Sequence, residues 1–195
     1  MTTKASVRDI NRTRLRESVV AAARDLTAAH GWDGVRMADV AAAVGVSRQT
    51  VYNEFGDRAG LAEQLALAEV QRFAEMVGRE LSAHGDDVHA AVHATIQRVL
   101  TEAAANPLVR AILTGDRGGG ELMPYLTTRS NIVLHAAGEV VAGWVRVQRP
   151  ELDDGAAAAA ADVIIRLVIS HIVMPGESSA ASAEALSGVF MRLLG

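Results

Sequence analysis

Apolar residues recur every three or four positions along almost the whole chain, which is the spacing of one face of an α-helix. The first such face lies between Leu15 and Leu26, and its segment ends at the sequence HGWDG. Two short segments follow, MADVAAAVG and SRQTVYNEF, and a long segment runs from about Gly60 to Leu81. Convincing β alternation does not appear. The pattern therefore predicts an all-α chain.

The second half of the chain continues the helical pattern. Its helices are predicted at residues 86–106, 107–115, 125–147, 156–174 and 179–194. A Gly-rich stretch, DRGGGELMP, separates the second and third of them and is typical of a loop. We expect about nine helices: three short ones at the N-terminus, followed by a larger helical body.

Composition narrows the class of protein. The 195 residues are 50% hydrophobic, which is enough to bury a core, and they include no cysteine, so disulfides and thiolate chemistry are excluded. The N-terminus lacks the apolar run of a signal peptide, and we expect a cytoplasmic protein. The apolar stretch 156–174 carries Asp162 and Arg166 in its middle, so a packed helix is favoured there and no membrane partner is expected.

Charge is distributed unevenly along the chain. Residues 1–60 hold nine Lys or Arg and seven Asp or Glu, whereas the remaining residues hold ten and sixteen. Five of the nine bases precede residue 17, where Asp9 is the only acid. This asymmetry favours an N-terminal end that faces a polyanion, although a solvated charged tail has the same composition.

The two short segments have the features of a helix-turn-helix. Gly45 supplies a sharp turn, and Ser47 is a good N-cap for the second helix. Val46 and Val51 occupy the two positions of a hydrophobic staple, which fixes the angle at which the chain enters that helix. Two helices held at a fixed angle across a short Gly-containing turn form a helix-turn-helix.

The second helix of this motif has a polar outer face. Val51 and Phe55 are predicted to point to the core, which leaves Gln49, Thr50 and Asn53 opposite, Tyr52 on the flank and Arg48 at the N-terminal end. Arg, Gln and Asn are suited to base edges, and Thr and Tyr hydroxyls to phosphates. An ordinary solvated helix face is the alternative.

The stretch MADVAAAVGVSRQTVYNEFGDRAGL resembles the DNA-binding signature of the TetR family of transcriptional repressors. The matching residues are Val40, Ala41, Gly45, Val46, Ser47, Thr50, Tyr52, Phe55, Arg58 and Leu61, and Gly31 with Trp32 matches the Gly-aromatic turn that precedes the motif. The body beyond the motif matches the family in length, helicity and helix order.

The resemblance implies a fold and a function. The fold is a three-helix DNA-binding domain with its N-terminal arm, residues 1–59, followed by a helical ligand-binding and dimerisation domain, residues 60–195. The function is that of a ligand-responsive repressor, which binds a palindromic operator as a homodimer and is released by a small apolar ligand. The DNA-binding residues that it implies, together with the outer face, are Arg36, Ser47, Arg48, Gln49, Thr50, Tyr52, Asn53 and Arg58.

Three residues depart from the family pattern. Arg36 replaces the Thr that usually caps the first helix of the motif, which puts that cap in doubt and favours a phosphate contact. Gln49 replaces a Gly or Pro and adds a potential reader of bases. Glu54 replaces a Tyr or His that touches DNA, and an acid there is expected to repel phosphate. Arg58 corresponds to the family's basic phosphate contact.

The resemblance also implies a dimer through the last two helices, and the residues permit it, although the protomer's own core competes for them. The predicted interface residues are Val163, Leu167, Ser170, His171, Met174, Leu186, Val189, Phe190 and Leu193.

A family-type ligand pocket is expected among the middle helices, with core packing as the alternative role for each residue. The candidate wall residues are Val92, Ile96, Leu100, Leu113, Met123, Tyr125, Leu126, Val140, Trp144 and Ile169. Aromatic residues are only 4% of the chain, and no lone acid stands out within an apolar run of the middle helices as a counter-ion for a cation. We therefore expect an apolar ligand, neutral or weakly anionic, such as a fatty-acyl or other lipid-like molecule. Gly118–Gly120 is either a mobile entrance to the pocket or a simple connection.

Other chemistry receives little support. His89 and His93 stand at i and i+4, a spacing that can bind a transition metal, but no third ligand is assured, and we assign no metal. Catalytic and cofactor-binding motifs do not appear, so neither an enzyme nor a cofactor is expected. The alternative function is a helical ligand-binding or metal-sensing protein with weak or no DNA binding, and Glu54 is the residue that favours it.

Overall fold

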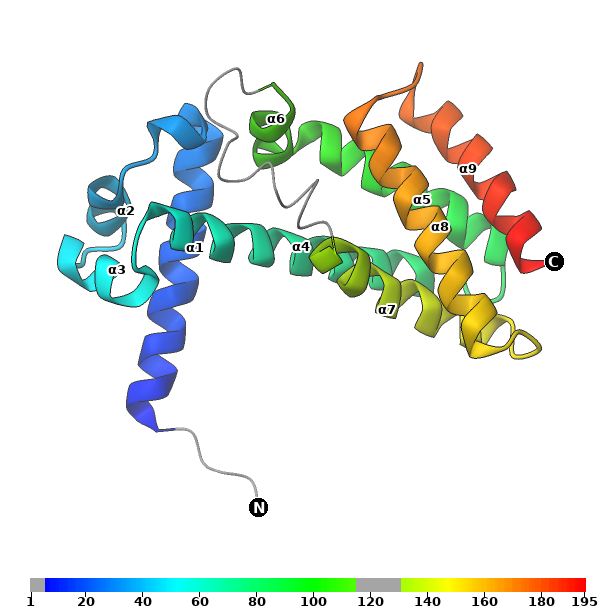
Figure 1. Ribbon diagram of the computed structural model, residues 1–195, viewed down its shortest axis with the longest axis horizontal. Helices are drawn as coiled ribbons and strands as arrows, with labels where there is room; N and C mark the ends of the chain where they lie inside the picture. The colour runs from blue at the N-terminus through cyan, green and yellow to red at the C-terminus, as the bar shows by residue number, and fades with distance from the viewer. Residues whose placement is uncertain (1–5, 115–130) are drawn as a thin grey trace.

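The computed structural model describes residues 6–114 and 131–195, and only the backbone of residues 111–114. Within these ranges the chain forms nine α-helices and no strand. The helices are α1 (Val7–Gly34), α2 (Met37–Ala43), α3 (Arg48–Phe55), α4 (Arg58–Ser82), α5 (Val88–Ala105), α6 (Pro107–Thr114), α7 (Asn131–Gln148), α8 (Asp154–Val173) and α9 (Ser179–Leu194). The all-α prediction is confirmed. Figure 1 shows α1, α2 and α3 at one end, α7, α8 and α9 at the other, and α4 running between them.

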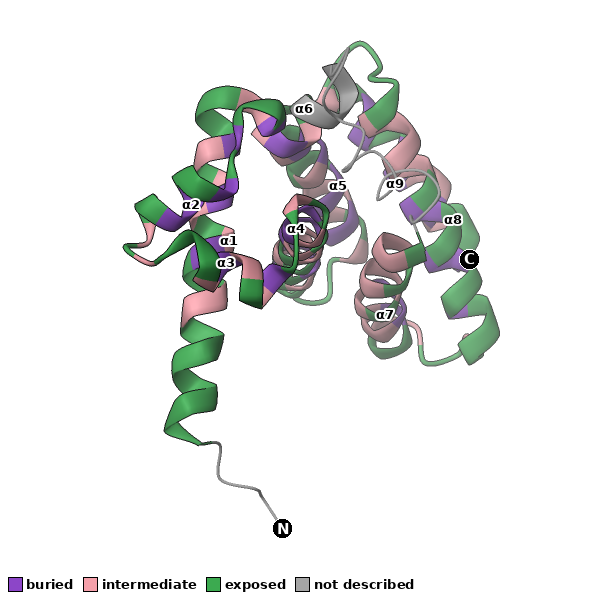
Figure 2. Cartoon of the chain, turned by 60° about the vertical axis from the view of Figure 1, so that its left-hand side comes forward, coloured by how far each residue is buried: buried purple, intermediate pink, exposed green. Residues whose placement is uncertain are grey.

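Side-chain caps set where most of these helices begin. The hydroxyl of Ser47 accepts from the backbone N–H of Thr50 at 3.1 Å, so the predicted cap of α3 is confirmed. At the N-terminus, Ser6 and Asp9 form a capping box. Because this box starts α1 at Val7, the part of the expected basic arm from residue 7 onward is the exposed first part of a helix (Figure 2). Helix α1 contains one non-helical residue, Gly31 at φ +70°, at the predicted Gly-aromatic turn. The helical part before Gly31 is long, so the expectation of a short first helix is wrong.

Two glycines allow close turns around α3. Gly45 has φ +71°, a left-handed conformation that turns the chain between α2 and α3 as predicted. Gly60 lies in the first turn of α4, where a Cβ atom would overlap the backbone carbonyl oxygen of Phe55. The end of α3 and the start of α4 therefore approach each other more closely than a side chain at residue 60 would allow.

The protein buries two clusters of apolar side chains, which we call the head core and the body core. The head core contains Val19, Ala23, Trp32, Val40, Val51 and Leu61, among others, from α1 to α4, together with Leu108 of α6. The body core contains Val92, Ile96, Val145, Ile164, Leu186 and Phe190, among others, from α5 and α7 to α9, with the end of α4. Helix α4 contributes to both, Leu61 and Leu65 to the first and Val77 and Leu81 to the second.

Helix α8 is the one helix in the described ranges that is long and apolar enough to cross a membrane by length and composition. Its Asp162 and Arg166 form an ion pair at 2.7 Å on the exposed side. Its Ala157, Ala161 and Ile165 are buried in the body core. In this structure α8 is a packed helix of the body.

Candidate nucleic-acid interface and ligand cavity

Helix α3 presents a ridge of polar side chains to solvent. Val51 is 1% exposed and Phe55 is buried, so the predicted orientation of the helix is confirmed. Gln49 and Asn53 are exposed, and Gln49 Nε2 donates to Asn53 Oδ1 at 2.9 Å. These i, i+4 partners hold each other in place on the outer face, where amide groups are available to a base edge.

A second pair lies on the same helix. Arg48 Nη2 donates to the hydroxyl oxygen of Tyr52 at 3.1 Å, and the guanidinium carbon lies 5.2 Å from the centre of the Tyr52 ring. The Ser47 and Thr50 hydroxyls are 2.8 Å apart at the N-terminal end of α3. Arg48, Ser47 and Thr50 thus surround the end of the helix that carries the partial positive charge of its dipole.

Arg36 is exposed and precedes α2 without a side-chain cap, as the departure from the family pattern predicted. Its guanidinium is on the same lobe as α3, and the phosphate contact stays a prediction.

Glu54 is paired with two arginines of α1. Arg12 Nε donates to both carboxylate oxygens, at 3.0 and 2.8 Å, and Arg16 Nη1 lies 3.4 Å from one of them. The hydrogen bond from Arg12 lowers the pKa of Glu54, partly offset by burial. The carboxylate is therefore ionised and its charge is compensated within the protein. The repulsion of phosphate expected from Glu54 alone is therefore weaker. Glu54 then gives less support to the alternative of a protein that does not bind DNA.

Arg58 joins the start of α4 to the end of α1. Its Nη2 donates to the backbone carbonyl oxygen of Trp32 at 2.6 Å, and its guanidinium lies 4.8 Å from the centre of the Trp32 ring. The same group is 3.6 Å from Asp33. Arg58 therefore stabilises the DNA-binding unit itself, while its predicted phosphate contact stays a prediction.

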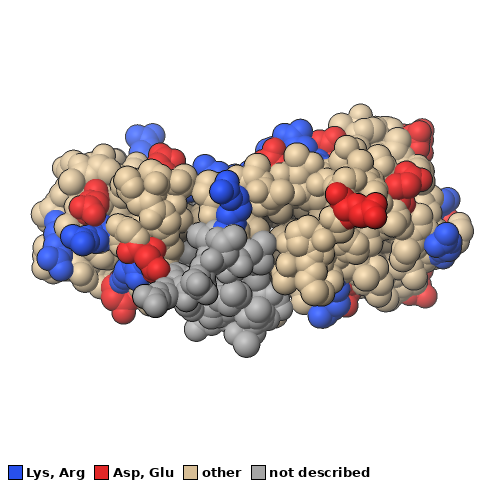
Figure 3. All heavy atoms as spheres, turned by 90° about the horizontal axis from the view of Figure 1, so that it is seen from above, with Lys and Arg blue, Asp and Glu red and all other residues tan. Residues whose placement is uncertain are grey.

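Charges of both signs are interspersed on the face seen in Figure 3, where arginines lie beside acids on the lobe formed by α1, α2 and α3. On this face the lobe carries no unbroken basic patch.

The body contains an apolar cavity of about 190 Å³. It lies between α4, α5, α7 and α8, with α6 and α9 closing parts of its wall. Its described lining residues include Val70, Phe73, Val77, Val92, Thr95, Ile96, Val141, Ile165, Val168 and Ile169. The lining follows α5 from Val92 to Asn106, a length of about 20 Å at the helical rise. Such a long apolar space suits an aliphatic chain.

The predicted wall residues have different locations. Val92, Ile96 and Ile169 line the cavity, and Leu100 lines a neighbouring hollow beside His171 and Ser182. Val140 and Trp144 pack against the body core without lining the cavity. The side chain of Leu113, together with Met123, Tyr125, Leu126 and the Gly118–Gly120 entrance, lies outside the described residues.

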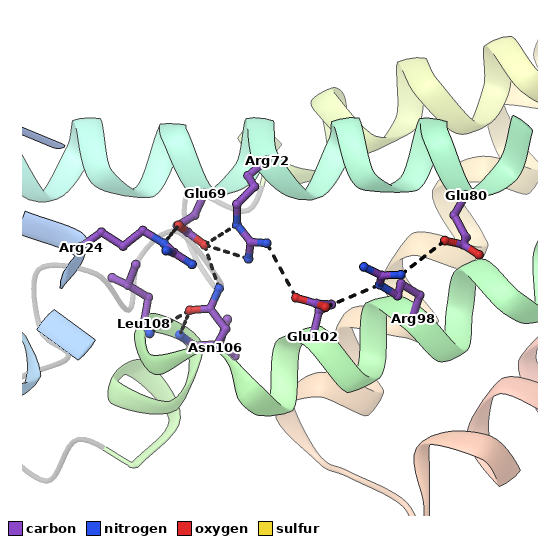
Figure 4. Close-up of polar contacts among 9 residues, drawn as sticks. Arg24, Glu69, Arg72, Glu80, Arg98, Glu102, Asn106 and Leu108 are labelled. Carbon is purple, nitrogen blue, oxygen red and sulfur yellow. Dashed lines mark hydrogen bonds and ion pairs between the residues drawn. The ribbon is translucent and has the colours of Figure 1, made fainter. Parts of the chain in front are cut away.

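One end of the cavity is polar, and Glu69 is at its centre (Figure 4). Three residues hold its carboxylate: Asn106 through Nδ2 at 2.7 Å, Arg24 through Nε at 2.6 Å, and Arg72 through Nε and Nη2, each at 3.2 Å. We call Glu69 and these three partners the Glu69 clamp. Burial raises the pKa of Glu69, but the bond from Asn106 and the nearby Arg72 and Arg24 outweigh burial, and the net pKa is lowered.

The clamp connects parts of the chain that are distant in sequence. Arg24 belongs to α1, Glu69 and Arg72 to α4, and Asn106 to the turn between α5 and α6. Asn106 Oδ1 also accepts from the N–H of Leu108 at 2.9 Å and so caps α6. The α5–α6 turn is thereby bonded, through Glu69, to both α4 and α1.

Sequence reasoning missed Glu69 and Asn106 as site residues. Glu69 stands in an amphipathic helix where an acid is ordinarily solvated, and two of its three partners, Asn106 and Arg24, are 37 and 45 residues away. Asn106 was interpreted only as the end of a helix. Its position before Pro107, however, is the pattern of an N-cap followed by Pro at the first helical position, which could have identified Asn106 as the cap of the helix predicted at 107–115.

The predicted dimer residues divide into two groups. Val163 and Leu193 are 40% and 43% exposed, and Leu167, His171 and Val189 are half-buried, so these side chains are accessible on α8 and α9. Leu186 and Phe190 are 4% and 2% exposed because they pack into the body core of the same protomer. The prediction for these two residues is corrected: they support the surface from beneath and do not form it.

His89 and His93 stack with ring centroids 6.4 Å apart, and His93 Nε2 lies 3.6 Å from a carboxylate oxygen of Glu184. Within the described parts of the chain, no group of three potential ligands is placed to hold a metal ion.

Comparison with known proteins identifies the two lobes. Residues 19–65 match the family described as bacterial regulatory proteins, tetR family, and residues 87–192 match the bacterial tetracyclin repressor C-terminal domain. The chain is 35% identical over 170 residues to the HTH-type transcriptional regulator AlkX of Mycobacterium tuberculosis, covering 87% of this chain and 80% of that protein.

Two solved structures share the fold. One is a TetR family repressor AlkX from Dietzia sp. implicated in biodegradation of n-alkanes, with 31% identity and a TM-score of 0.78 over 91% of this chain and 96% of that one. The other is Thermus thermophilus FadR in complex with lauroyl-CoA, with 18% identity and a TM-score of 0.61 over 90% and 93%. The lobe built around α3 and the body built around the cavity are the two halves of one known architecture, and the chain belongs to the TetR family of DNA-binding, ligand-responsive transcriptional regulators.

Proposed function

We propose that this regulator represses transcription as a homodimer on a palindromic operator and leaves the DNA when an aliphatic ligand occupies the cavity. The main observation that supports the DNA-binding part of this proposal is the ridge of polar side chains on α3. Its side chains are exposed and paired, while Val51 and Phe55 fix the helix in the head core. A helix held in this way is suited to the major groove, with Arg48, Gln49 and Asn53 at base edges.

The dimer is proposed to form through the exposed faces of α8 and α9. A single α3 offers few contacts, and two copies held by a fixed interface match two half-sites. For B-form DNA this requires the two α3 helices to lie about 34–36 Å apart, or a multiple of that distance. The protein acts in the cytoplasm, where operator DNA is present.

The ligand is proposed to be a fatty-acyl or other lipid-like molecule. The cavity supports this proposal because its walls are apolar along a length of about 20 Å beside α5. Two proteins that share the fold also favour an aliphatic ligand: AlkX from Dietzia sp. is implicated in n-alkane biodegradation, and Thermus thermophilus FadR has been solved in complex with lauroyl-CoA.

Release is proposed to act through the Glu69 clamp. A ligand that displaces the α5–α6 turn shifts Asn106, and the clamp passes this shift to α1 and α4. The ligand changes the DNA-binding equilibrium only by its differential affinity for the two conformers. By reciprocity, saturating operator DNA weakens ligand binding by the same factor.

Gel-shift and fluorescence anisotropy with the DNA that flanks the gene test this proposal. Arg48→Ala and Gln49→Ala should each weaken operator binding by about 1–3 kcal/mol and relax preference at particular bases, because each removes a base contact. Unchanged base preference in both variants would contradict the assignment of α3 as the reading helix. Equal ligand affinity with and without operator would contradict ligand-driven release.

A further inference from the structure

The cavity wall contains one hydroxyl without a protein partner. Thr95 lies in the middle of α5, lines the cavity and is 6% exposed, and its Oγ1 makes no hydrogen bond to the described part of the protein. Thr27 is a buried threonine of α1 at 2% exposure, and its Oγ1 donates to the carbonyl oxygen of Ala23 at 2.7 Å. Thr27 shows the ordinary way in which a helical threonine satisfies its hydroxyl. Thr95 does not follow it.

The surroundings of Thr95 supply no substitute partner. Among the described lining residues, the only other polar side chains are Glu69 and Asn106, which bond to each other at 2.7 Å. They lie at the Asn106 end of the cavity, about 16 Å further along α5 at the helical rise. A buried hydroxyl without a partner destabilises the folded protein, so an apolar residue would serve packing better at this position.

We propose that Thr95 recognises a single neutral oxygen on an otherwise aliphatic ligand, such as the oxygen of an alcohol, an aldehyde or an ester. A threonine hydroxyl both donates and accepts, so it is suited to any of these groups. This inference rests on the proposed function and specifies its ligand: an oxygenated chain is bound in preference to the parent hydrocarbon.

The charges around the cavity favour a neutral group over a carboxylate. The one charged side chain among the described lining residues is Glu69, an anion whose positive partners are already used in the clamp. A carboxylate beside Thr95 would enter an apolar space without a positive partner and would lose most of its hydration, which is strongly unfavourable.

The test compares 1-decanol with n-undecane, which have the same number of heavy atoms and differ by one hydroxyl. Binding of each to the full-length protein is measured by displacement of a fluorescent apolar probe, for wild type, Thr95→Val and Thr95→Ser. The preference for the alcohol should be about tenfold greater in wild type than in Thr95→Val, since valine has a similar shape without the hydroxyl. Thr95→Ser keeps the hydroxyl and should keep most of the preference.

A stability measurement separates recognition from packing. The thermal midpoint of the ligand-free protein should rise in Thr95→Val, because an unsatisfied hydroxyl is removed. In Thr27→Val, where a bonded hydroxyl is removed, it should not rise.

The inference is overturned if Thr95→Val keeps the full preference for the alcohol, or if neither 1-decanol nor n-undecane displaces the fluorescent probe. It is also overturned if decanoate binds more tightly than 1-decanol, or if the thermal midpoint does not rise in Thr95→Val. Operator binding is measured on the same samples. If DNA binding fails while the alcohol preference depends on Thr95, the proposed function fails and the assignment of Thr95 stands.

Discussion

The head core and the body core are built from similar residues but are packed for different tasks. In the head core, Trp32 is 1% exposed and the buried hydroxyl of Thr27 is satisfied. In the body core, an apolar cavity of about 190 Å³ remains and the buried hydroxyl of Thr95 is left without a partner. A helix that contacts DNA needs side chains at fixed positions, whereas a ligand-binding body needs internal space.

The two cores are also connected differently to their surroundings. The head core is joined to the body through α4 and through the Glu69 clamp, which adds Arg24 of α1 to Arg72 and Asn106 of the body. Figure 4 shows the chain of ion pairs continuing from Arg72 through Glu102 and Arg98 to Glu80, along the facing sides of α4 and α5. Polar contacts of α4 and α5 thus link the lobe that carries α3 to the lobe that contains the cavity.

The largest expected effect comes from making the same substitution in both cores. Ala23 is 0% exposed in the head core, and Ala74 is 6% exposed and lines the cavity. Ala23→Leu should destabilise the protein by about 1–3 kcal/mol, because a close-packed core has no room for the added carbons. Ala74→Leu should leave stability unchanged or raise it by about 0.5–2 kcal/mol, because the added carbons fill the cavity.

Chemical denaturation of both variants measures this difference in the free energy of unfolding, and titration with the ligand gives a second measurement. Ala74→Leu should keep operator affinity and lose the response to the aliphatic ligand, since the leucine occupies the ligand's space. A destabilisation of Ala74→Leu as large as that of Ala23→Leu would show that the two cores are packed alike.

The next effect concerns the connection between the lobes and depends on pH. The folded pKa of Glu69 lies below its unfolded value, so the ionised carboxylate stabilises the protein above pH about 4.3, and the contribution is lost as pH falls through the folded pKa. Glu69→Gln should cost about 1–2 kcal/mol near neutral pH, a value reduced from that of a fully buried pair because Arg24 is 41% exposed.

Denaturation of wild type and Glu69→Gln from pH 7 down to pH 3 tests this. The stability difference between the two proteins should shrink on the acid side, and ligand should release less DNA from the variant at neutral pH. A difference that does not vary with pH would mean that the carboxylate charge is not what holds the clamp.

The smallest effect on stability is expected at the surface of the head. Glu54→Gln should leave the thermal midpoint nearly unchanged, since Arg12, its main partner, is 62% exposed and such an ion pair contributes little. It should release Arg12 for phosphate, and the slope of log K against log salt should steepen by about 0.9 for each further phosphate that the protein neutralises. Glu17→Gln makes the same charge change at an exposed position on α1 and serves as the control. Equal slopes in the two variants would show that Glu54 does not hold Arg12 away from DNA.

Local sequence determined the elements of this protein with little help from tertiary contacts. The helical period, Gly45 and Ser47 predicted the helix-turn-helix, and Val51 and Phe55 predicted which face of α3 is exposed. These features depend on residues within one or two helical turns of each other, so they can be inferred from the spacing of residue types along the chain. The start of α1 was missed by the apolar pattern because the capping box of Ser6 and Asp9, and not a buried face, determines it.

Only the tertiary structure decided what the buried residues do. Sequence could not separate Val92, which lines the cavity, from Trp144, which packs beside it, because both are apolar residues on helical faces. Nor could it show that Leu186 and Phe190 face the protomer's own core, since an interface and a core have the same composition. Glu69 gains its role from Arg24 and Asn106, which are far away in the chain. A cavity, a clamp and an unpaired hydroxyl are properties of how helices pack, and the spacing of residues along one helix does not contain them.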